Sequence, residues 1–179
     1  MVTASGIEVR ADLSSLALRV GMEPARPTSD YNYYRHRMNK QKIYDAIPHR
    51  EPFLLVDEIL EQSEDKIVCT KVFTGEEDFF AGHYPGFPLV PGVLLCEAAM
   101  QCGAILLSKK FADVEGKVPV ATRLNNVRLK RMVRPGDLLR MEVTLDDKLS
   151  DAFFLTGKVT VEGKMAVRFE FACTAADMT

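Results

Sequence analysis

The chemistry of this chain is most concentrated in the stretch AGHYPGFPLVPG, residues 81–92, where one histidine stands among three glycines and three prolines. Proline fixes φ and glycine permits positive φ or close backbone approach, so we expect an ordered loop here instead of helix or strand. Imidazole is the side chain that most readily exchanges a proton near neutral pH. The stretch therefore predicts that His83 is held rigidly for acid–base chemistry.

The loop ends at Gly92, where a long helix is expected to begin. The first backbone N–H groups of a helix lack intrahelical partners and carry partial positive charge. Because Gly92 has no side chain, an oxygen atom of a ligand should reach its N–H directly. The sequence thus predicts an imidazole, a helix N-terminus and bare backbone in one place.

A carboxyl group follows on the same helix. Glu97 lies in an otherwise apolar segment, and Gln101 lies one turn further on the same face. A lone ionised carboxylate is costly in apolar surroundings, so we expect Glu97 to be partnered or protonated, with Gln101 placed to orient it. Taken singly, Glu97 also fits a satisfied buried polar group, and His83 fits a loop histidine packed on a neighbouring ring.

The composition is that of an ordinary globular protein, with 47% apolar and 27% charged residues and a net charge of −2 over 179 residues. This charge gives no electrostatic case for nucleic acid, and the length suggests one domain with an appendage. The four cysteines are scattered without a CxxC pair, so we expect free thiols in a reducing cytoplasm and no metal site. The apolar run 93–108 is short for a membrane span and contains Glu97.

Residues 1–45 differ from the rest and are interpreted as an N-terminal extension of unknown role. Asp12 is expected to cap a short helix through Val20. Five basic residues, three tyrosines and one acid then follow between residues 26 and 42: Arg26, Arg35, Arg37, Lys40, Lys42, Tyr31, Tyr33, Tyr34 and Asp30. Such a strip suits an anionic partner or base stacking, and it equally suits a solvated arm or a strip packed on a neighbouring subunit.

Residues 46–179 have the pattern of one α+β domain. One helix is expected over 92–110, and because it is apolar on nearly every face it must be wrapped by other elements. Short β-rich runs separated by turn residues predict strands over 52–60, 66–74, 118–124 continuing toward 133, 138–145, 153–161 and 165–174. The order predicts a curved antiparallel sheet wrapped around one long central helix.

Three stretches resemble the β-hydroxyacyl-acyl carrier protein dehydratases of the FabZ type and, more distantly, of the FabA type. They are IPHREPFLLVDEI at 47–59, FFAGHYPGFPLVPGVLLCEAAMQ at 79–101 and RPGDLL at 134–139. The pattern GHxPxxPxxPGxxxxEAxxQ is highly specific, and the interval from His83 to Glu97, 97 − 83 = 14 residues, is that of the family. The resemblance extends over essentially everything after the N-terminal extension.

The resemblance implies the hot dog fold and removal of water from a 3-hydroxyacyl thioester to give the trans-2-enoyl thioester in fatty acid biosynthesis. His83 corresponds to the catalytic base and Glu97 to its carboxylic acid partner. The amide of Gly92 corresponds to the donor that holds the thioester carbonyl, and Gln101 to the orienting neighbour of Glu97. The substrate of this family is carried on the phosphopantetheine of acyl carrier protein, and neither a metal nor another cofactor is implied.

The remaining expected contacts with the substrate and its carrier surround this centre. Tyr84, Phe87 and Leu89 are assigned to the pocket wall, although Phe87 stands where relatives are usually polar and Tyr84 where phenylalanine is usual. A basic cluster is expected to dock the acidic carrier protein, or alternatively to keep a strand edge soluble. Its members are Arg128, Lys130, Arg131 and Arg134, with Arg123 nearby.

The resemblance also implies a homodimer, or a trimer of such dimers, in which His83 of one subunit faces Glu97 of the other.

Two other functions stay open at this point. The same fold hosts acyl thioesterases, and fold alone does not select a reaction. A non-enzymatic acyl-thioester-binding module is the second alternative, although such a module needs neither an acid nor a base.

Overall fold

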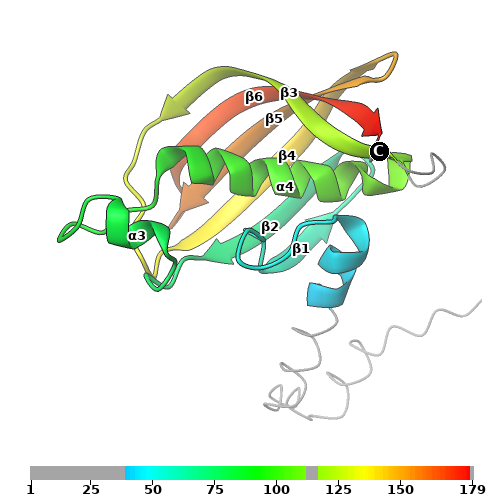
Figure 1. The fold of residues 1–179 in the computed structure, drawn as a ribbon. Coiled ribbons are helices and arrows are strands. Elements are labelled where there is room, and N and C mark those ends of the chain that lie inside the picture. Colours follow the sequence, from blue (N-terminus) through cyan, green and yellow to red (C-terminus); the bar gives the residue numbers. More distant parts are fainter. Residues whose placement is uncertain (1–38, 112–116, 178–179) are drawn as a thin grey trace, which may run out of the picture. The chain divides into compact units, whose positions relative to one another are not determined.

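The computed structural model of the protein describes residues 39–111 and 117–177 (Figure 1). The described residues belong to one compact unit. The helix expected from Asp12 to Val20 and most of the basic, tyrosine-containing strip lie outside the described residues.

Six strands form one antiparallel sheet in the order β1-β2-β4-β5-β6-β3. Their bounds are β1 (Glu58–Gln62), β2 (Lys66–Val72), β3 (Lys117–Leu129), β4 (Leu138–Leu149), β5 (Ala152–Val161) and β6 (Lys164–Asp177). A two-residue connection joins β5 to β6 through Glu162 and Gly163, which both have positive φ, 51° and 74°. Two consecutive positive φ values match the twist of a two-residue hairpin, so this turn fixes the register of the last two strands.

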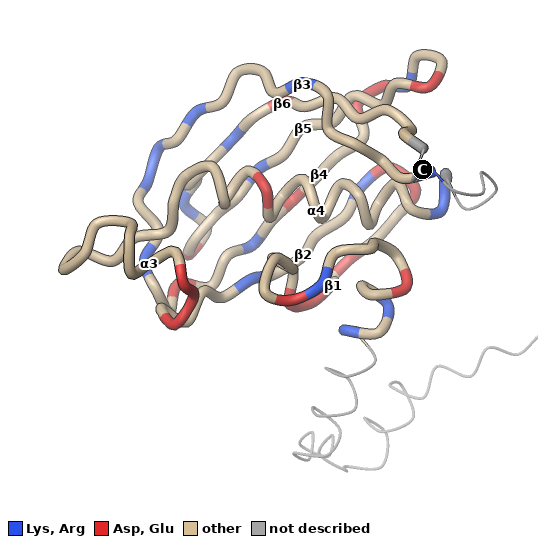
Figure 2. The backbone as a smooth tube through the Cα atoms, viewed as in Figure 1, with Lys and Arg blue, Asp and Glu red and all other residues tan. Residues whose placement is uncertain are grey.

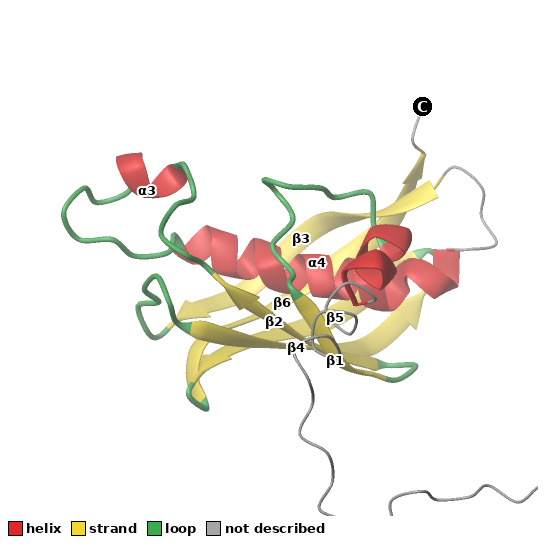
Figure 3. Ribbon diagram, turned by 90° about the horizontal axis from the view of Figure 1, so that it is seen from below, coloured by secondary structure: helices red, strands yellow, loops and turns green. Residues whose placement is uncertain are grey.

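The helix α4 (Gly92–Phe111) lies along the sheet, and the turned view shows the strands curving beneath it (Figures 1 and 3). It contacts β2, β3, β4, β5 and β6. A Cβ atom added at Gly103 would lie 2.7 Å from Cζ of Phe171, so the glycine permits close packing of the helix on the sheet. The sheet wrapped around one long helix, which the sequence predicted, is confirmed.

The apolar character of α4 is explained by this packing. By length and composition the helix could cross a membrane, but 61% of its most apolar stretch is buried inside the protein. Ala98, Ala99 and Cys102 are fully buried against the sheet. The helix is therefore the core of the domain.

A short helix over residues 39–46 also belongs to the domain. Ile43 is fully buried in the core, and the side chain of Asn39 exchanges two hydrogen bonds with the backbone of Ile59, at 3.0 and 3.2 Å. This helix therefore packs on β1, although the sequence analysis assigned residues up to 45 to the N-terminal extension.

The first expected strand, 52–60, is displaced in the structure. Leu54, Leu55 and Val56 are buried but belong to no strand, and β1 begins only at Glu58 and continues into the stretch expected to be a turn. The reason is that Leu55 N–H donates to the side chain of Gln101 on α4, at 2.7 Å, instead of to a neighbouring strand. The apolar run was correctly predicted to be buried, but its hydrogen-bond partner is a helix side chain.

The strand β3 forms one edge of the sheet and pairs within the chain only with β6. Its pairing shifts at two bulges, between Ala121 and Arg123 and between Asn125 and Arg128. Nearly all of its residues are exposed, and four large apolar side chains on it are between 42% and 57% exposed: Val120, Leu124, Val127 and Leu129. An apolar exposed edge of this length is a ready template for pairing with another chain.

Candidate active site

The loop that carries His83 is an ordered turn, as its glycines and prolines predicted. The short helix α3 (Phe79–Gly82) ends where His83 N–H donates to Phe79 O at 2.8 Å. Tyr84 and Gly86 then adopt positive φ, 54° and 84°, and Phe87 N–H donates to Tyr84 O at 2.9 Å. The backbone on both sides of the imidazole is therefore fixed by hydrogen bonds and by conformations that few residues adopt.

The imidazole of His83 has one tautomer assigned by its neighbours. Its Nδ1 lies 3.1 Å from Leu89 O, and since a carbonyl oxygen only accepts, Nδ1 carries the hydrogen. The ring also packs edge-on against Tyr84, with centroids 4.8 Å apart and an interplanar angle of 87°. In the neutral ring, Nε2 is consequently the nitrogen available to accept a proton.

The start of α4 opens into a cavity of about 540 Å³. Leu94 N–H donates to Pro91 O at 2.9 Å, whereas Gly92 N–H has no acceptor among the described residues. A Cβ atom at Gly92 would lie 2.6 Å from Cδ1 of Leu129, so the glycine lets the Leu129 side chain pack directly against the start of α4. The cavity is lined by Leu89, Val90, Gly92, Leu95, Leu129, Lys130, Arg131 and Met132.

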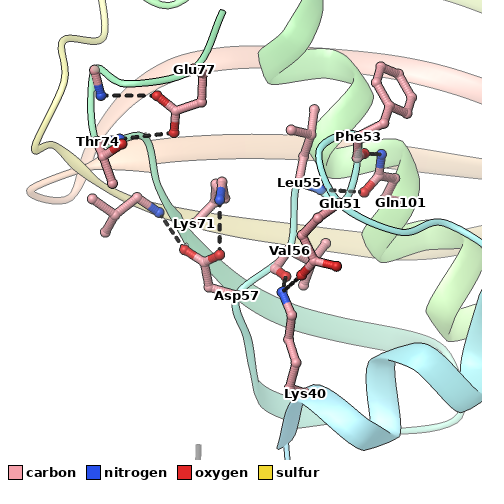
Figure 4. A network of polar contacts seen from close by, with 12 residues as sticks. Lys40, Glu51, Phe53, Leu55, Val56, Asp57, Lys71, Thr74, Glu77 and Gln101 are labelled. Carbon is pink, nitrogen blue, oxygen red and sulfur yellow. Dashed lines mark hydrogen bonds and ion pairs between the residues drawn. The ribbon is translucent and has the colours of Figure 1, made fainter.

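Glu97 lies further along α4, beside Gln101. Gln101 Nε2 donates to Glu97 Oε1 at 3.0 Å, which is the contact expected from their spacing. The same amide donates to Phe53 O at 2.9 Å and accepts from Leu55 N–H at 2.7 Å (Figure 4). Gln101 is only 1% exposed, so its amide is fully used between the carboxyl group and the loop before β1.

Glu97 and Gln101 line a second cavity, of about 270 Å³. It lies between the loop 47–49, one face of α4 and the start of β3, and most of its lining is apolar. The lining residues are Ile47, Pro48, His49, Glu97, Met100, Gln101, Ala104, Val118, Pro119, Val120, Ala121 and Cys173. Burial raises the pKa of Cys173 to about 11, so this thiol stays protonated and apolar in character.

His49 is a member of this cavity that the sequence did not single out. Its Nε2 lies 4.0 Å from Glu97 Oε1, and its ring stacks on Phe53 with centroids 6.4 Å apart and an interplanar angle of 22°. The only signal for it was its place in the stretch 47–59 that carries the family resemblance. Its proximity to Glu97 depends on a loop and a helix that are far apart in sequence.

The loop that carries His49 is anchored to the preceding helix. Glu51 accepts hydrogen bonds from Tyr44 Oη at 3.0 Å. It also forms an ion pair with Lys40 Nζ at 2.9 Å (Figure 4). Lys40 is the main cause that lowers the pKa of Glu51 to about 2, and the hydrogen bond to Glu51 raises the pKa of Tyr44. This network joins residues 39–46 to the loop on which His49 lies.

Asp57 and Glu77 anchor the backbone on the other side of the loop, also shown in Figure 4. Asp57 pairs with Lys71 Nζ at 3.0 Å and accepts from Val72 N–H at 2.8 Å, which ties the start of β1 to β2. Glu77 accepts from the N–H groups of Thr74 and Gly75, and these bonds contribute to lowering its pKa against the effect of burial. These carboxylates position backbone and belong to no part of the proposed chemistry.

Within one chain, the expected site residues are divided between the two cavities. Gly92 and Leu89 border the larger one, and Leu89 O binds the imidazole of His83, whereas Glu97 and Gln101 border the smaller one. In the described part of the chain, His83 and Glu97 share neither a hydrogen bond nor an ion pair. The single chain therefore presents two halves of the expected site.

The expected basic cluster is also divided. Lys130 and Arg131 line the cavity at Gly92, and the guanidinium of Arg134 lies over the Phe87 ring, 4.6 Å from its centroid. Arg128 instead pairs directly across from Arg168 on β6 and lines a separate hollow of about 170 Å³. Figure 2 shows the Lys and Arg positions along this end of β3 and the acidic positions beside α3.

No three His, Cys, Asp or Glu side chains are grouped to hold a metal ion within residues 39–111 and 117–177. The two cavities present an imidazole, a carboxyl group and a backbone amide as groups for acid–base chemistry.

Comparison with known proteins assigns the family. A model of the FabA-like domain matches residues 47–170. The chain is 44% identical over 129 residues to the 3-hydroxyacyl-[acyl-carrier-protein] dehydratase FabZ of Clostridium perfringens, covering 72% of this chain and 92% of that protein. It is 42% identical over 138 residues to the FabZ of Caulobacter sp., covering 76% of this chain and 85% of that one.

Solved structures support the same fold. The dehydratase heterocomplex ApeI:P from Xenorhabdus doucetiae aligns with a TM-score of 0.64 at 14% identity, over 75% of this chain and 91% of that one. A thioesterase from Haemophilus influenzae aligns with a TM-score of 0.51 at 19% identity, over 68% and 78%. These structures share the fold alone, and the expected hot dog architecture is confirmed. Because the family model covers most of the described residues and the sequence relatives match over most of their length, the chain belongs to the FabA-like family.

Proposed function

We propose that this protein is a 3-hydroxyacyl-[acyl-carrier-protein] dehydratase of fatty acid biosynthesis that acts in the cytoplasm. The observation that carries the proposal is the identity of 42% to 44% with FabZ dehydratases over 85% to 92% of their length. The matching region contains His83, Gly92, Glu97 and Gln101. The structural likeness to a thioesterase does not favour hydrolysis, because it reports the fold and not the reaction.

In the proposed reaction, Gly92 N–H binds the thioester carbonyl oxygen, where negative charge develops as the C2 proton leaves. The Gly92 N–H, which has no acceptor among the described residues, and the dipole of α4 support this role. Losing such a donor costs about 2.7–4 kcal/mol of transition-state stabilisation in other enzymes. His83 Nε2 accepts the C2 proton, because its Nδ1 hydrogen is held by Leu89 O. The electron pair of the C2–H bond forms the C2=C3 double bond.

Glu97 completes the proposed reaction as the acid. The C3–O bond breaks as its electron pair takes a proton from the carboxyl group, so the hydroxyl leaves as water. Glu97 Oε1 accepts the Gln101 amide hydrogen, and Oε2 makes no hydrogen bond among the described residues. A protonated Glu97 would therefore carry its hydrogen on Oε2, the oxygen left free for the substrate.

We further propose that two chains complete each site by pairing their β3 strands. One end of β3, Val118–Ala121, borders the Glu97 cavity, and the other end, Leu129, borders the Gly92 cavity. Antiparallel pairing of two β3 strands about their midpoint would bring opposite ends together, so the Glu97 half of one subunit would meet the His83 half of the other. The exposed apolar side chains of this edge support such an isologous interface.

The carrier protein is proposed to dock beside the Gly92 cavity. Lys130 and Arg131 on its rim and Arg134 over Phe87 present positive charge to an acidic partner. Arg128 is left outside this docking surface, because it faces Arg168 in a different hollow. Tyr84, Phe87 and Leu89 would then form the wall along which the phosphopantetheine enters.

Incubation with 3-hydroxyacyl-acyl carrier proteins of several chain lengths, with products resolved by mass, tests the function. The proposal expects loss of one water with the acyl group still on the carrier, and no product from the H83A variant. Release of free hydroxy acid and carrier thiol would indicate a thioesterase instead. Unchanged substrate, together with measurable binding, would indicate a non-enzymatic acyl-thioester-binding module.

A further inference from the structure

The mechanism proposed above makes no use of His49, although this residue lies in the same cavity as Glu97. Its side chain is 30% exposed, and its Nε2 lies 4.0 Å from Glu97 Oε1, which is beyond hydrogen-bond distance. A movement of about 1 Å would bring these atoms to a typical hydrogen-bond distance. Among the described residues that line the cavity, Glu97 is the only acid and His49 the only imidazole.

The other nitrogen of the ring decides its protonation pattern. Nδ1 of His49 is buried and has no hydrogen-bond partner, and it is the one buried side-chain nitrogen or oxygen in this state among the described residues. A buried N–H without an acceptor is rarer and less favourable than a buried lone pair. The geometry therefore favours a neutral ring with its hydrogen on Nε2, the nitrogen that faces Glu97.

Glu97 Oε1 is thus approached by two N–H donors from different parts of the chain. Gln101 Nε2 reaches it from the next turn of α4 at 3.0 Å, and His49 Nε2 faces it from the loop before β1. With both donors in contact, the rotation of the carboxyl group would be fixed. A hydrogen on Oε1 would then be disfavoured, and the carboxylic hydrogen would be directed to Oε2.

We propose that His49 is a positioning residue for Glu97, which donates its Nε2 hydrogen to Oε1 and thereby directs Oε2 to the substrate. The inference rests on the proposed dehydratase function, since it assigns a role within that site. The ring is itself oriented by stacking on Phe53, whose carbonyl also binds Gln101. One loop therefore supplies both a direct donor to Glu97 and an acceptor that orients the second donor.

Three substitutions separate this role from simple packing. H49F keeps a ring against Phe53 but removes the N–H. In H49Q the amide nitrogen reaches the position of Nε2, whereas in H49N the shorter amide reaches only that of Nδ1. The inference expects kcat to fall about 10- to 100-fold in H49F and H49N with KM changed less than about threefold, as for other misplaced catalytic groups, and to recover substantially in H49Q.

The kinetic results distinguish failure of this inference from failure of the proposed function. If the wild-type protein does not dehydrate the substrate, the function is wrong and the inference falls with it. If the wild type is active and H49F keeps its kcat within about threefold, the inference alone is wrong. If H49F does not fold, judged by circular dichroism, the contrast between H49Q and H49N decides, and equal kcat values in these two variants would overturn the inference.

A spectroscopic readout tests the same inference without any activity measurement. The chain contains three histidines, so long-range ¹H–¹⁵N spectra of ¹⁵N-histidine protein are simple, and H49Q and H83A assign the two rings of interest. We expect His49 as the tautomer with hydrogen on Nε2, and an altered Nε2–H signal in E97Q. A His49 ring with hydrogen on Nδ1, or one insensitive to E97Q, would overturn the inference even in an active enzyme.

Discussion

Gln101 Nε2 donates to Glu97 Oε1 at 3.0 Å while the same side chain binds the backbone of Phe53 and Leu55, residues 48 and 46 positions away. One amide group thus connects the proposed acid on α4 to the loop that precedes β1. The orientation of the carboxyl group and the position of that loop are consequently coupled.

Replacing Gln101 with leucine should destabilise the protein and also lower its dehydratase activity. Q101L leaves Phe53 O and Leu55 N–H without their buried partner, and each lost partner costs about 1–3 kcal/mol, so we expect a loss of about 2–6 kcal/mol. Urea unfolding at fixed protein concentration measures this free energy. S108A is the control, because it removes only the bond from Ser108 Oγ to Ile105 O on the same helix. A Q101L stability within about 1 kcal/mol of wild type would contradict the coupling.

Adding a methyl group at Gly92 should impair activity without unfolding the protein. In G92A the new Cβ would lie 2.6 Å from Cδ1 of Leu129, a flexible and exposed side chain that can move into the cavity. We expect stability to change by less than about 1 kcal/mol, because alanine favours the helix, and kcat/KM to fall about tenfold or more. The double variant G92A/L129A should regain part of this activity. Full activity in G92A alone would argue against binding of the carbonyl at this amide.

The sequence predicted the elements whose patterns are local. The long helix, β5 and β6 lie where apolar patterns and turn residues placed them, because 92–110, 153–161 and 165–174 carry their own start and stop signals. The start of β1 could not be predicted, because Leu55 bonds to a glutamine on α4 instead of a strand. The apolar pattern of residues 52–60 predicts that they are buried, but it does not predict which groups their backbone hydrogen-bonds to.

The same distinction applies to the candidate site. His83, Gly92, Glu97 and Gln101 belong to one continuous stretch with a specific spacing, so the sequence alone was enough to predict them as site residues. His49 was missed because its relation to Glu97 exists only after the loop before β1 packs on α4. The separate position of Arg128 was missed for a similar reason, since Arg128 lies within β3 and pairs with Arg168 on β6, whereas Lys130 and Arg131 follow the end of β3 and line the cavity at Gly92.

The ion pair between Glu51 and Lys40 should make stability depend on pH in acid. The pKa of Glu51 is lowered from 4.5 to about 2 in the folded protein. The contribution of the ionised Glu51 to the free energy of unfolding is therefore fully present above about pH 4.5 and is lost as pH falls through about 2. Because Glu51 is 54% exposed, we expect E51Q to cost less than about 1 kcal/mol at pH 7, with the difference from wild type shrinking below pH 4.5.

Carbon-13 titration of the Glu51 carboxyl, together with urea unfolding from pH 7 to pH 3, measures this effect. E64Q is the control, because Glu64 is 92% exposed and lies 3.8 Å from its partner Lys110. A Glu51 carboxyl that titrates near its ordinary value, or an E51Q effect that persists undiminished in acid, would show that the pair does not stabilise the loop.

Charge reversal on the rim of the Gly92 cavity should weaken docking of the carrier. For K130E we expect KM for carrier-bound substrate to rise about fivefold or more, with kcat nearly unchanged, because positive charge guides the acidic partner to the site. KM for the corresponding pantetheine thioester should not change. K109E reverses a charge at the other end of α4 and serves as the control. An unchanged KM for carrier-bound substrate in K130E would exclude this docking surface.

The proposal that two subunits share each site predicts complementation between inactive variants. H83A and E97A should each lack dehydratase activity while remaining dimeric by analytical ultracentrifugation. After subunit exchange, a mixed dimer contains one site with both substitutions and one site with neither. An equal mixture should therefore regain up to about a quarter of the wild-type activity, since about half of the dimers are mixed.

Dehydration of 3-hydroxyacyl-acyl carrier protein by the exchanged mixture of H83A and E97A is the most direct measurement. The account predicts that activity appears only after exchange and that the double variant H83A/E97A, mixed with either single variant, restores none. Absence of recovery, with mixed dimers demonstrated by differential tagging, would show that the imidazole and the carboxyl group do not meet between subunits.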